Sequence, residues 1–195
     1  MYGSVGGDTV AGGSGNDLLD GGDRKTATAD DGVDTADYSI GDNDAAQSSG
    51  ISLVLGESGV VLDGAKGILA TDDGYGSSDR LFSIEKVKGT SKSDSVTIKS
   101  TDLSGYALTG NQLEIDAGGN DTGRGDVLDF SAMGAGINVT LAADHGLAIN
   151  AITLKNFETF IATSFDDTMS AGEGDQQFYG GAAARTHPPS FRGGP

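Results

Sequence analysis

The sequence contains no cysteine and no tryptophan, and its three prolines all lie within the last eight residues. Without cysteine the chain can form no disulfide bond, no thiolate metal site and no cysteine nucleophile, and its redox compartment cannot be inferred. No run of 18 apolar residues occurs, so we expect no membrane span. The first residues also lack the basic and apolar parts of an N-terminal signal peptide.

Positive charge and large apolar side chains are also scarce. The chain carries 29 acidic residues against 12 Lys and Arg, a formal net charge of −17, and only 36% of its residues are hydrophobic. Such a charge argues against nucleic acid or an anionic membrane as the main partner and favours a cationic one. Because apolar burial is limited, we expect a metal ion held by oxygen ligands to help stabilise the fold.

Glycine is abundant, with 33 residues. Together with the strong preference for Asp over Glu, this composition is typical of turns rather than helices. The sequence therefore predicts an all-β protein.

The N-terminal region contains a nine-residue repeat. Residues 12–20 match the pattern G-G-x-G-x-D-x-U-x, in which U is an apolar residue, at every specified position. Residues 3–11 depart from it only at Ser4. A third copy begins at residue 21, is interrupted by residues 24–31, which we expect to form a surface loop, and resumes at residues 32–37.

The repeat has a physical logic of its own. Its glycines permit a turn with positive φ and close backbone approach, which leaves carbonyls and the Asp carboxylate directed inward. The following x-U-x segment forms a short strand with the U side chain (Val10, Leu19 or Ala36) in the interior. Stacked turns bring carboxylates together, and Ca²⁺ suits the gap because it accepts six to eight oxygens with flexible geometry.

This pattern resembles the RTX (repeats-in-toxin, hemolysin-type) calcium-binding family. The resemblance implies a parallel β-roll, secretion through a type I channel, and folding outside the cell where calcium is abundant. The candidate calcium ligands of the nonapeptides are the carboxylates of Asp8, Asp17 and Asp34 and the turn residues Gly6, Gly13 and Gly15.

A longer repeat covers most of the remaining chain. Residues 34–39, 50–55 and 84–95 recur in the same order as residues 126–131, 136–141 and 157–168. Apolar and polar residues alternate in these blocks, as in Ile51, Leu53 and Leu55, which predicts half-buried strands. We expect the recurring aromatic residues to fill the interior: Tyr38, Phe130, Phe157 and Phe160.

Three further aspartates, Asp94, Asp126 and Asp167, occupy comparable positions without the upstream Gly-Gly pair. They are candidate calcium ligands or ordinary turn residues. For Glu85 and Glu158, which follow an apolar residue in both long units, we favour a structural role at a coil edge.

Taken together, these patterns predict a right-handed parallel β-solenoid. Residues 1–37 would form a calcium-binding β-roll, residues 38–108 a first long unit, and residues 109–182 a second unit that ends in degenerate nonapeptides. We expect residues 183–195 to be a disordered tail or an expression remnant.

The predicted function is that of a calcium-folded repeat module in a larger secreted bacterial protein. One alternative is an adhesin module that binds a polysaccharide or another cell-surface ligand. A second alternative is a polysaccharide lyase or epimerase fragment, for which Asp144, His145 and Lys155 are the candidate catalytic residues. Because no other catalytic motif occurs, we expect a non-enzymatic protein.

Overall fold

The computed structural model describes residues 1–22, 32–119, 125–142, 146–171, 176–181 and 190–192. These residues form β-strands and loops, and the helical part of these ranges consists of two 3₁₀ turns, η1 (Ser39–Gly41) and η2 (Thr109–Asn111). The expectation of an all-β protein is confirmed.

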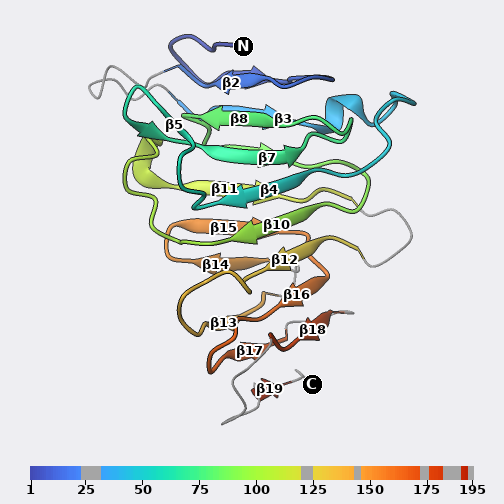
Figure 1. Ribbon diagram of the computed structural model, residues 1–195, viewed down its shortest axis with the longest axis vertical. Coiled ribbons are helices and arrows are strands. Elements are labelled where there is room, and N and C mark those ends of the chain that lie inside the picture. Colours follow the sequence, from blue (N-terminus) through green and yellow to red (C-terminus); the bar gives the residue numbers. More distant parts are fainter. Residues whose placement is uncertain (23–31, 120–124, 143–145, 172–175, 182–189, 193–195) are drawn as a thin grey trace.

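An eight-stranded sheet forms one face of the molecule (Figure 1). Its strands are, in spatial order, β18 (Gln177–Tyr179), β16 (Thr159–Ile161), β12 (Val127–Asp129), β10 (Ser95–Ile98), β4 (Ser52–Leu55), β7 (Ile68–Asp72), β8 (Asp79–Phe82) and β2 (Leu18–Asp20). Neighbouring strands run parallel except where β7 pairs with β4 and with β8.

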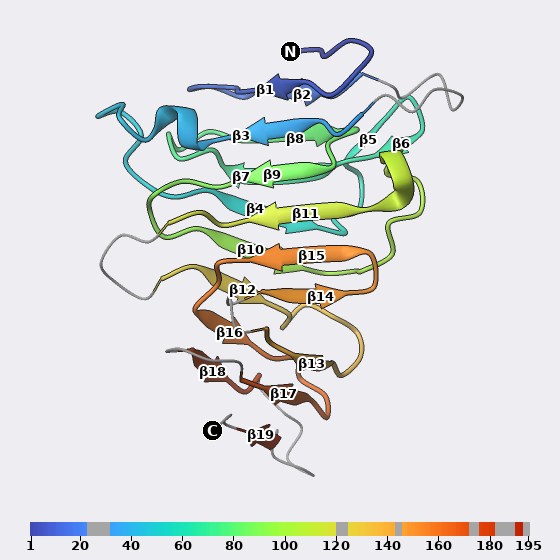
Figure 2. The same cartoon turned by 180° about the vertical axis from the view of Figure 1, so that it is seen from behind.

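A six-stranded sheet forms the opposite face (Figure 2). Its strands are, in order, β1 (Thr9–Val10), β3 (Thr35–Asp37), β9 (Lys86–Lys88), β11 (Leu113–Asp116), β15 (Ile152–Lys155) and β14 (Leu147–Ile149). All pairs are parallel except β14 with β15. The antiparallel pairs make both large sheets mixed, whereas the sequence led us to expect parallel strands throughout.

Two small sheets complete the structure. The strands β13 (Asn138–Thr140), β17 (Thr168–Ser170) and β19 (Ser190–Arg192) are parallel, and β5 (Val61–Leu62) and β6 (Ala65–Lys66) form an antiparallel hairpin. Residues 190–192 fall within the expected tail, and their backbone pairs with β17. The other residues of the expected tail, 183–189 and 193–195, lie outside the described residues. The expected surface loop at 24–31 also lies outside them.

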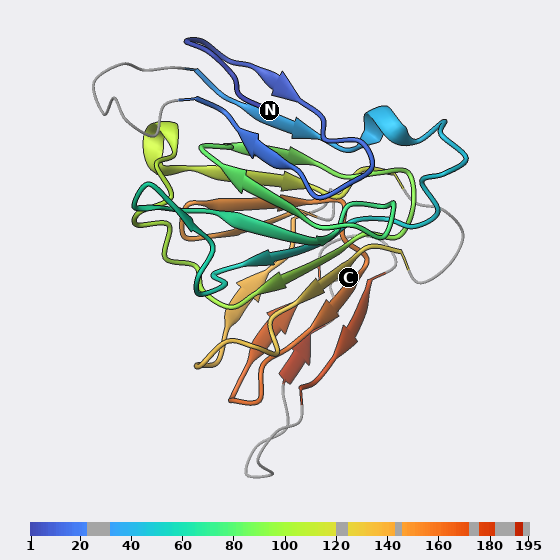
Figure 3. The same ribbon diagram turned by 45° about the horizontal axis from the view of Figure 1, so that its top comes forward.

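The chain passes repeatedly from one large sheet to the other. The strands β2, β4, β8, β10 and β12 belong to the eight-stranded sheet, and β1, β3, β9 and β11 to the six-stranded sheet. Figure 3 shows the resulting stack from a tilted view. One insertion interrupts it, because the hairpin formed by β7 and β8 lies between β4 and β2 in the eight-stranded sheet.

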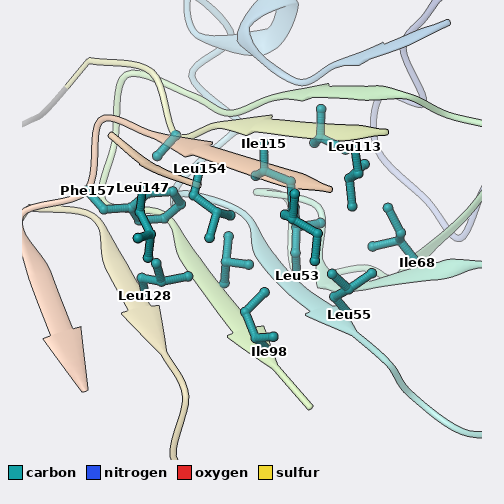
Figure 4. Close-up of a cluster of buried hydrophobic side chains, with 14 of the residues drawn as sticks. Leu53, Leu55, Ile68, Ile98, Leu113, Ile115, Leu128, Leu147, Leu154 and Phe157 are labelled. Carbon is teal, nitrogen blue, oxygen red and sulfur yellow. The ribbon is translucent and has the colours of Figure 1, made fainter. Parts of the chain in front are cut away.

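The core fills the space between the two large sheets (Figure 4). Alternation along β4 places Leu53 and Leu55 in this core, at 1% and 0% exposure, as the sequence predicts. Register continues the row from Leu53 to Val96, Leu128 and Phe160 in successive strands. The other residues predicted to face inward are also buried: Val10, Leu19, Ala36, Tyr38, Ile51, Phe130, Ile137, Val139, Leu141 and Phe157.

In the described ranges, no helix is long and apolar enough to cross a membrane.

Candidate metal centre

The predicted ligand carboxylates share one structural position, the residue directly before a strand. This holds for Asp8, Asp17, Asp34, Asp94, Asp126 and Asp167, which precede β1, β2, β3, β10, β12 and β17. Because β1 pairs with β3, β2 with β8 and β10 with β12 in parallel, the residues that start the two strands of each pair lie at the same edge of the sheet. The fold thereby brings carboxylates that are far apart in sequence into rows.

The nonapeptide turns have the backbone that their glycines predict. Gly6, Gly13 and Gly15 adopt φ values of 101°, 75° and 121°. A side chain is strained in this region, so these positions favour glycine. The turns thus place Asp8 and Asp17 at the strand starts.

One row of acidic side chains follows the six-stranded sheet. The N–H of Asp8 donates to Oδ1 of Asp34 at 2.8 Å, and the N–H of Asp34 donates to Oε2 of Glu85 at 2.8 Å. Oε1 of Glu85 accepts the N–H of Thr109 at 2.8 Å. The carboxylates of Asp34 and Glu85 therefore each cap the backbone of a neighbouring turn, which agrees with a structural role for Glu85.

A second row follows the eight-stranded sheet in the same way. The N–H of Ile51 donates to Oδ1 of Asp94 at 2.6 Å, and the N–H of Asp94 donates to Oδ1 of Asp126 at 2.7 Å. The N–H of Asp126 donates to Oε2 of Glu158 at 2.9 Å. The Glu158 carboxylate thus accepts the backbone N–H of Asp126, as the Glu85 carboxylate accepts that of Asp34. This correspondence agrees with the sequence repeat.

Asp167 repeats the environment of Asp94 in the small three-stranded sheet. It accepts the N–H of Ile137 at 2.9 Å and the hydroxyl of Thr163 at 2.7 Å. Asp94 likewise accepts the hydroxyl of Thr90, at 3.0 Å. The two long units therefore match in their hydrogen bonds as well as in sequence, although Asp167 does not join either of the longer rows.

The row containing Asp17 includes a residue that the sequence analysis did not identify. The N–H of Asp17 donates to Oδ1 of Asp79 at 2.8 Å, and the Tyr38 hydroxyl donates to Oδ2 of Asp79 at 3.1 Å. Asp79 begins β8, whose residue Leu81 pairs with Leu19. The shared pattern D-x-L at 17–19 and 79–81 is the signal that could have revealed this pairing.

Two carboxylate oxygens in these rows are enclosed and accept no hydrogen bond, Oδ2 of Asp17 and Oδ2 of Asp126, and the same is true of Oδ2 of Asp73 in the loop between β7 and β8. Burial, reinforced by the negative charges of Asp94 and Glu158, raises the pKa of Asp126 to about 8, although the hydrogen bond from the Asp94 N–H opposes the rise. An enclosed oxygen of this kind needs either a proton or a cation.

Burial also raises the pKa of Asp79 and of Asp94 to about 6, against the hydrogen bonds that both carboxylates accept. Three of the stacked carboxyl groups are therefore held in surroundings that disfavour their charge. Positive charge placed among them would favour the ionised form.

The oxygen donors fit a hard divalent cation such as Ca²⁺, which accepts carboxylate and backbone carbonyl oxygens. Within the described part of the chain, no three Asp, Glu, His or Cys side chains converge closely enough to hold a metal ion by themselves. An ion at these rows would therefore take backbone carbonyls or water in addition to one or two carboxylates.

The residues considered for catalysis do not form a described site. Asp144 and His145 lie outside the described residues. Nζ of Lys155 lies 2.6 Å from Oε2 of Glu114, and Nζ of Lys86 lies 2.8 Å from Oε1 of the same carboxylate. The two Lys–Glu ion pairs place Lys155 in a charged ladder on the outer face of the six-stranded sheet.

Comparison with known proteins gave no further assignment. The sequence matches no protein-family model and no curated protein sequence.

Proposed function

We propose that this chain is a calcium-binding repeat module that folds when its acidic turns take up Ca²⁺, and that it forms part of a larger exported protein. The observation that carries the proposal is the enclosed, unpartnered oxygen on Asp17 and on Asp126, each within a row of stacked carboxylates. The net charge of −17 adds to the need for a cationic partner.

A finer description of the fold belongs to the same proposal. The passage of successive strands between two mainly parallel sheets supports a right-handed parallel β-solenoid. In this description the nonapeptides at residues 1–37 are β-roll turns, and the two long units are irregular coils. The hairpin of β7 and β8 is then an insertion into one coil.

The residues that would hold the ions are the carboxylates at the strand starts. Asp8 lies against Asp34, and Asp94 lies against Asp126, so each pair can offer oxygens from two neighbouring turns. Calcium, when bound, would supply the positive charge that offsets their mutual repulsion. The side chains already accept backbone N–H groups, which orients them before an ion arrives.

Folding and binding are coupled in this scheme. In the unfolded chain the carboxylates are solvated and far apart, whereas the folded state brings them together in buried rows. A cation that binds only the folded state stabilises it by about 2.7 kcal/mol when its concentration is 100 times Kd. Low calcium would leave the chain expanded for export, and high calcium outside the cell would fold it.

Circular dichroism tests this proposal directly. The protein is dialysed against EDTA, and its spectrum and melting temperature are recorded before and after addition of millimolar CaCl₂, with MgCl₂ as the comparison ion. We expect calcium to increase β-structure and raise the melting temperature, and magnesium to do much less because it demands a tighter octahedral site.

Two variants with the same change in charge sharpen this experiment. Asp17→Asn removes a carboxylate with an enclosed oxygen, whereas Asp166→Asn alters an exposed residue next to a strand start. We expect Asp17→Asn to need more calcium for folding and Asp166→Asn to behave as the wild type. A wild-type spectrum and melting temperature that do not respond to calcium would overturn the proposal.

A further inference from the structure

The outward side chains of the eight-stranded sheet include one continuous row, which we call the outer row (Figure 1). Strand register places its members side by side, from β2 to β16: Leu18, Arg80, Leu69, Val54, Thr97, Asp129 and Ile161. Their neighbours in the same strands, such as Leu53 and Val96, are buried in the core. Alternation along each strand therefore directs the outer row away from the core.

The outer row is largely apolar. Its apolar members are Leu18, Leu69, Val54 and Ile161, each of which is partly exposed. The outer face of the six-stranded sheet differs, because Lys86 and Lys155 both pair there with Glu114. In a chain that is only 36% hydrophobic and carries a net charge of −17, a contiguous apolar row on one outer face indicates an interaction surface.

The two charged residues of the outer row lie symmetrically about its centre. Arg80 is two strands from Val54 on one side, through β7, and Asp129 is two strands away on the other side, through β10. Neighbouring strands are about 4.8 Å apart, so each charge lies about 10 Å from Val54. Beyond the charges, both ends of the row are apolar, with Leu18 at one and Ile161 at the other.

Both charges are available to a partner. Arg80 is exposed, and within the described ranges it forms no ion pair, in contrast to the lysines of the opposite face. Oδ1 of Asp129 accepts the N–H of Ser131 at 2.7 Å, which orients the carboxylate and leaves Oδ2 for another donor. An Arg guanidinium and a carboxylate can form two parallel hydrogen bonds.

We propose that the outer row binds a second copy of the same chain, in a dimer whose twofold axis passes beside Val54 and runs parallel to the strands. Rotation about this axis reverses the order of the strands. Arg80 of each copy then meets Asp129 of the other, Leu18 meets Ile161, Leu69 meets Thr97, and Val54 meets its own counterpart. This inference goes beyond the proposed calcium-binding function and does not rest on it.

The outward row next to it fits the same arrangement. This second row contains Ser52, Ser95 and Val127, and its charged member is Asp72. The rotation places Asp72 opposite Ser95 of the other copy, whose hydroxyl can donate to a carboxylate. The charged residues of the two rows therefore meet either an opposite charge or a neutral donor.

The size of this face and the charge of the chain set the strength of the dimer. The seven strands of the outer row cover roughly 30 Å by 10 Å, which is less than stable dimers use. Two copies that each carry −17 also repel one another unless salt screens them. We therefore expect a reversible dimer that forms at high protein concentration and is favoured by moderate salt.

Sedimentation at increasing protein concentration tests the charge pairs. The measurements are made in millimolar CaCl₂ and about 0.15 M NaCl, where the Debye length is about 8 Å. We expect the wild type to dimerise, and Arg80→Glu to raise the dimer Kd about tenfold or more, because it places two negative charges together. The double variant Arg80→Glu with Asp129→Arg should restore dimerisation.

The control variant is Lys92→Glu, which makes the same change in net charge outside both rows. We expect it to dimerise like the wild type. Circular dichroism verifies that every variant folds, and rescue by the double variant separates a contact between copies from a structural role within one copy.

A single cysteine tests the position of the axis. The natural chain has no cysteine. Sheets packed face to face lie about 10 Å apart, farther than a disulfide can bridge, so a short bismaleimide is used as the cross-linker. We expect Val54→Cys to give a covalent dimer, and Thr35→Cys, on the outer face of the six-stranded sheet, to remain monomeric.

Several outcomes would overturn the inference. A monomer at every concentration would leave this face to a different partner. An unchanged Kd in Arg80→Glu, no rescue by the double variant, or equal cross-linking of Thr35→Cys and Val54→Cys would show that the copies do not meet at the outer row. A dimer that behaves as expected in a protein that does not respond to calcium would uphold this inference and overturn the proposed function alone.

Discussion

An acidic residue at a strand start has two roles in this protein. One carboxylate oxygen accepts a backbone N–H from the neighbouring turn, as Oδ1 of Asp126 does from Asp94. The other oxygen of Asp126 is enclosed and has no partner. The first role needs only a hydrogen-bond acceptor, whereas the second makes the residue sensitive to protons and cations.

Asp126 should therefore make the calcium-free protein less stable as pH rises. Its pKa is raised from 3.8 to about 8 in the folded state, so the folded state binds this proton more tightly than the unfolded chain. The resulting stability is fully present below the ordinary pKa and is lost as pH rises through the raised value. Chemical denaturation in EDTA across this range measures the effect.

The matched variant is Asp126→Asn, in which the neutral side chain cannot titrate. We expect its stability in EDTA to depend less steeply on pH than that of the wild type. Equal slopes for the two proteins would show that another group dominates the titration.

At the scale of elements, the two long units use the same junction between a glycine and an aspartate. A Cβ on Gly50 would lie 2.1 Å from the Ser93 carbonyl oxygen, and a Cβ on Gly136 would lie 2.0 Å from that of Asp166. Glycine therefore allows each strand start to pack against the turn that carries Asp94 or Asp167. The sequence repeat has a direct counterpart in backbone spacing.

This junction predicts the effect of adding a methyl group. Gly50→Ala and Gly136→Ala should each destabilise the protein by about 1–3 kcal/mol, because backbone must move to admit the side chain. The control Gly134→Ala, which has open space around its Cβ position, should change stability by less than about 0.5 kcal/mol. Urea denaturation in calcium measures all three, and a neutral Gly50→Ala would contradict the described packing.

The elements also show which features the sequence could predict. Period-two alternation found the buried residues of β4, and the nine-residue phase found Asp8, Asp17 and Asp34. Neither pattern could find the partner of Asp17, because β8 reaches β2 through an inserted hairpin. Asp79 lies next to Asp17 only because of that tertiary arrangement. Short-range periodicity carries no information about which strands pair in this way.

At the scale of the whole molecule, charge and core work against each other. A net charge of −17 is distributed over a chain in which only 36% of residues are hydrophobic. Some of the charge is paired on the outer surface, as where Lys86 and Lys155 both contact Glu114. The stacked carboxylates at the strand starts instead lie against one another.

Salt and calcium should consequently act differently. Sodium chloride screens exposed charges, with a Debye length of about 10 Å at 0.1 M and about 3 Å at 1 M, but screens buried pairs much less. We expect NaCl in EDTA to raise the melting temperature slightly, and millimolar calcium at matched ionic strength to raise it more. Equal effects would indicate general screening instead of bound ions.

The pairing of β2 with β8 also has a consequence in time. Asp17, directly before β2, and its partner Asp79 in β8 lie 62 residues apart, so the first turns cannot complete their part of the eight-stranded sheet from neighbouring sequence alone. Until residues 79–82 arrive, β2 has a bare edge and its turn cannot be completed. Such a distant contact slows folding, so the beginning of this chain must wait for its middle.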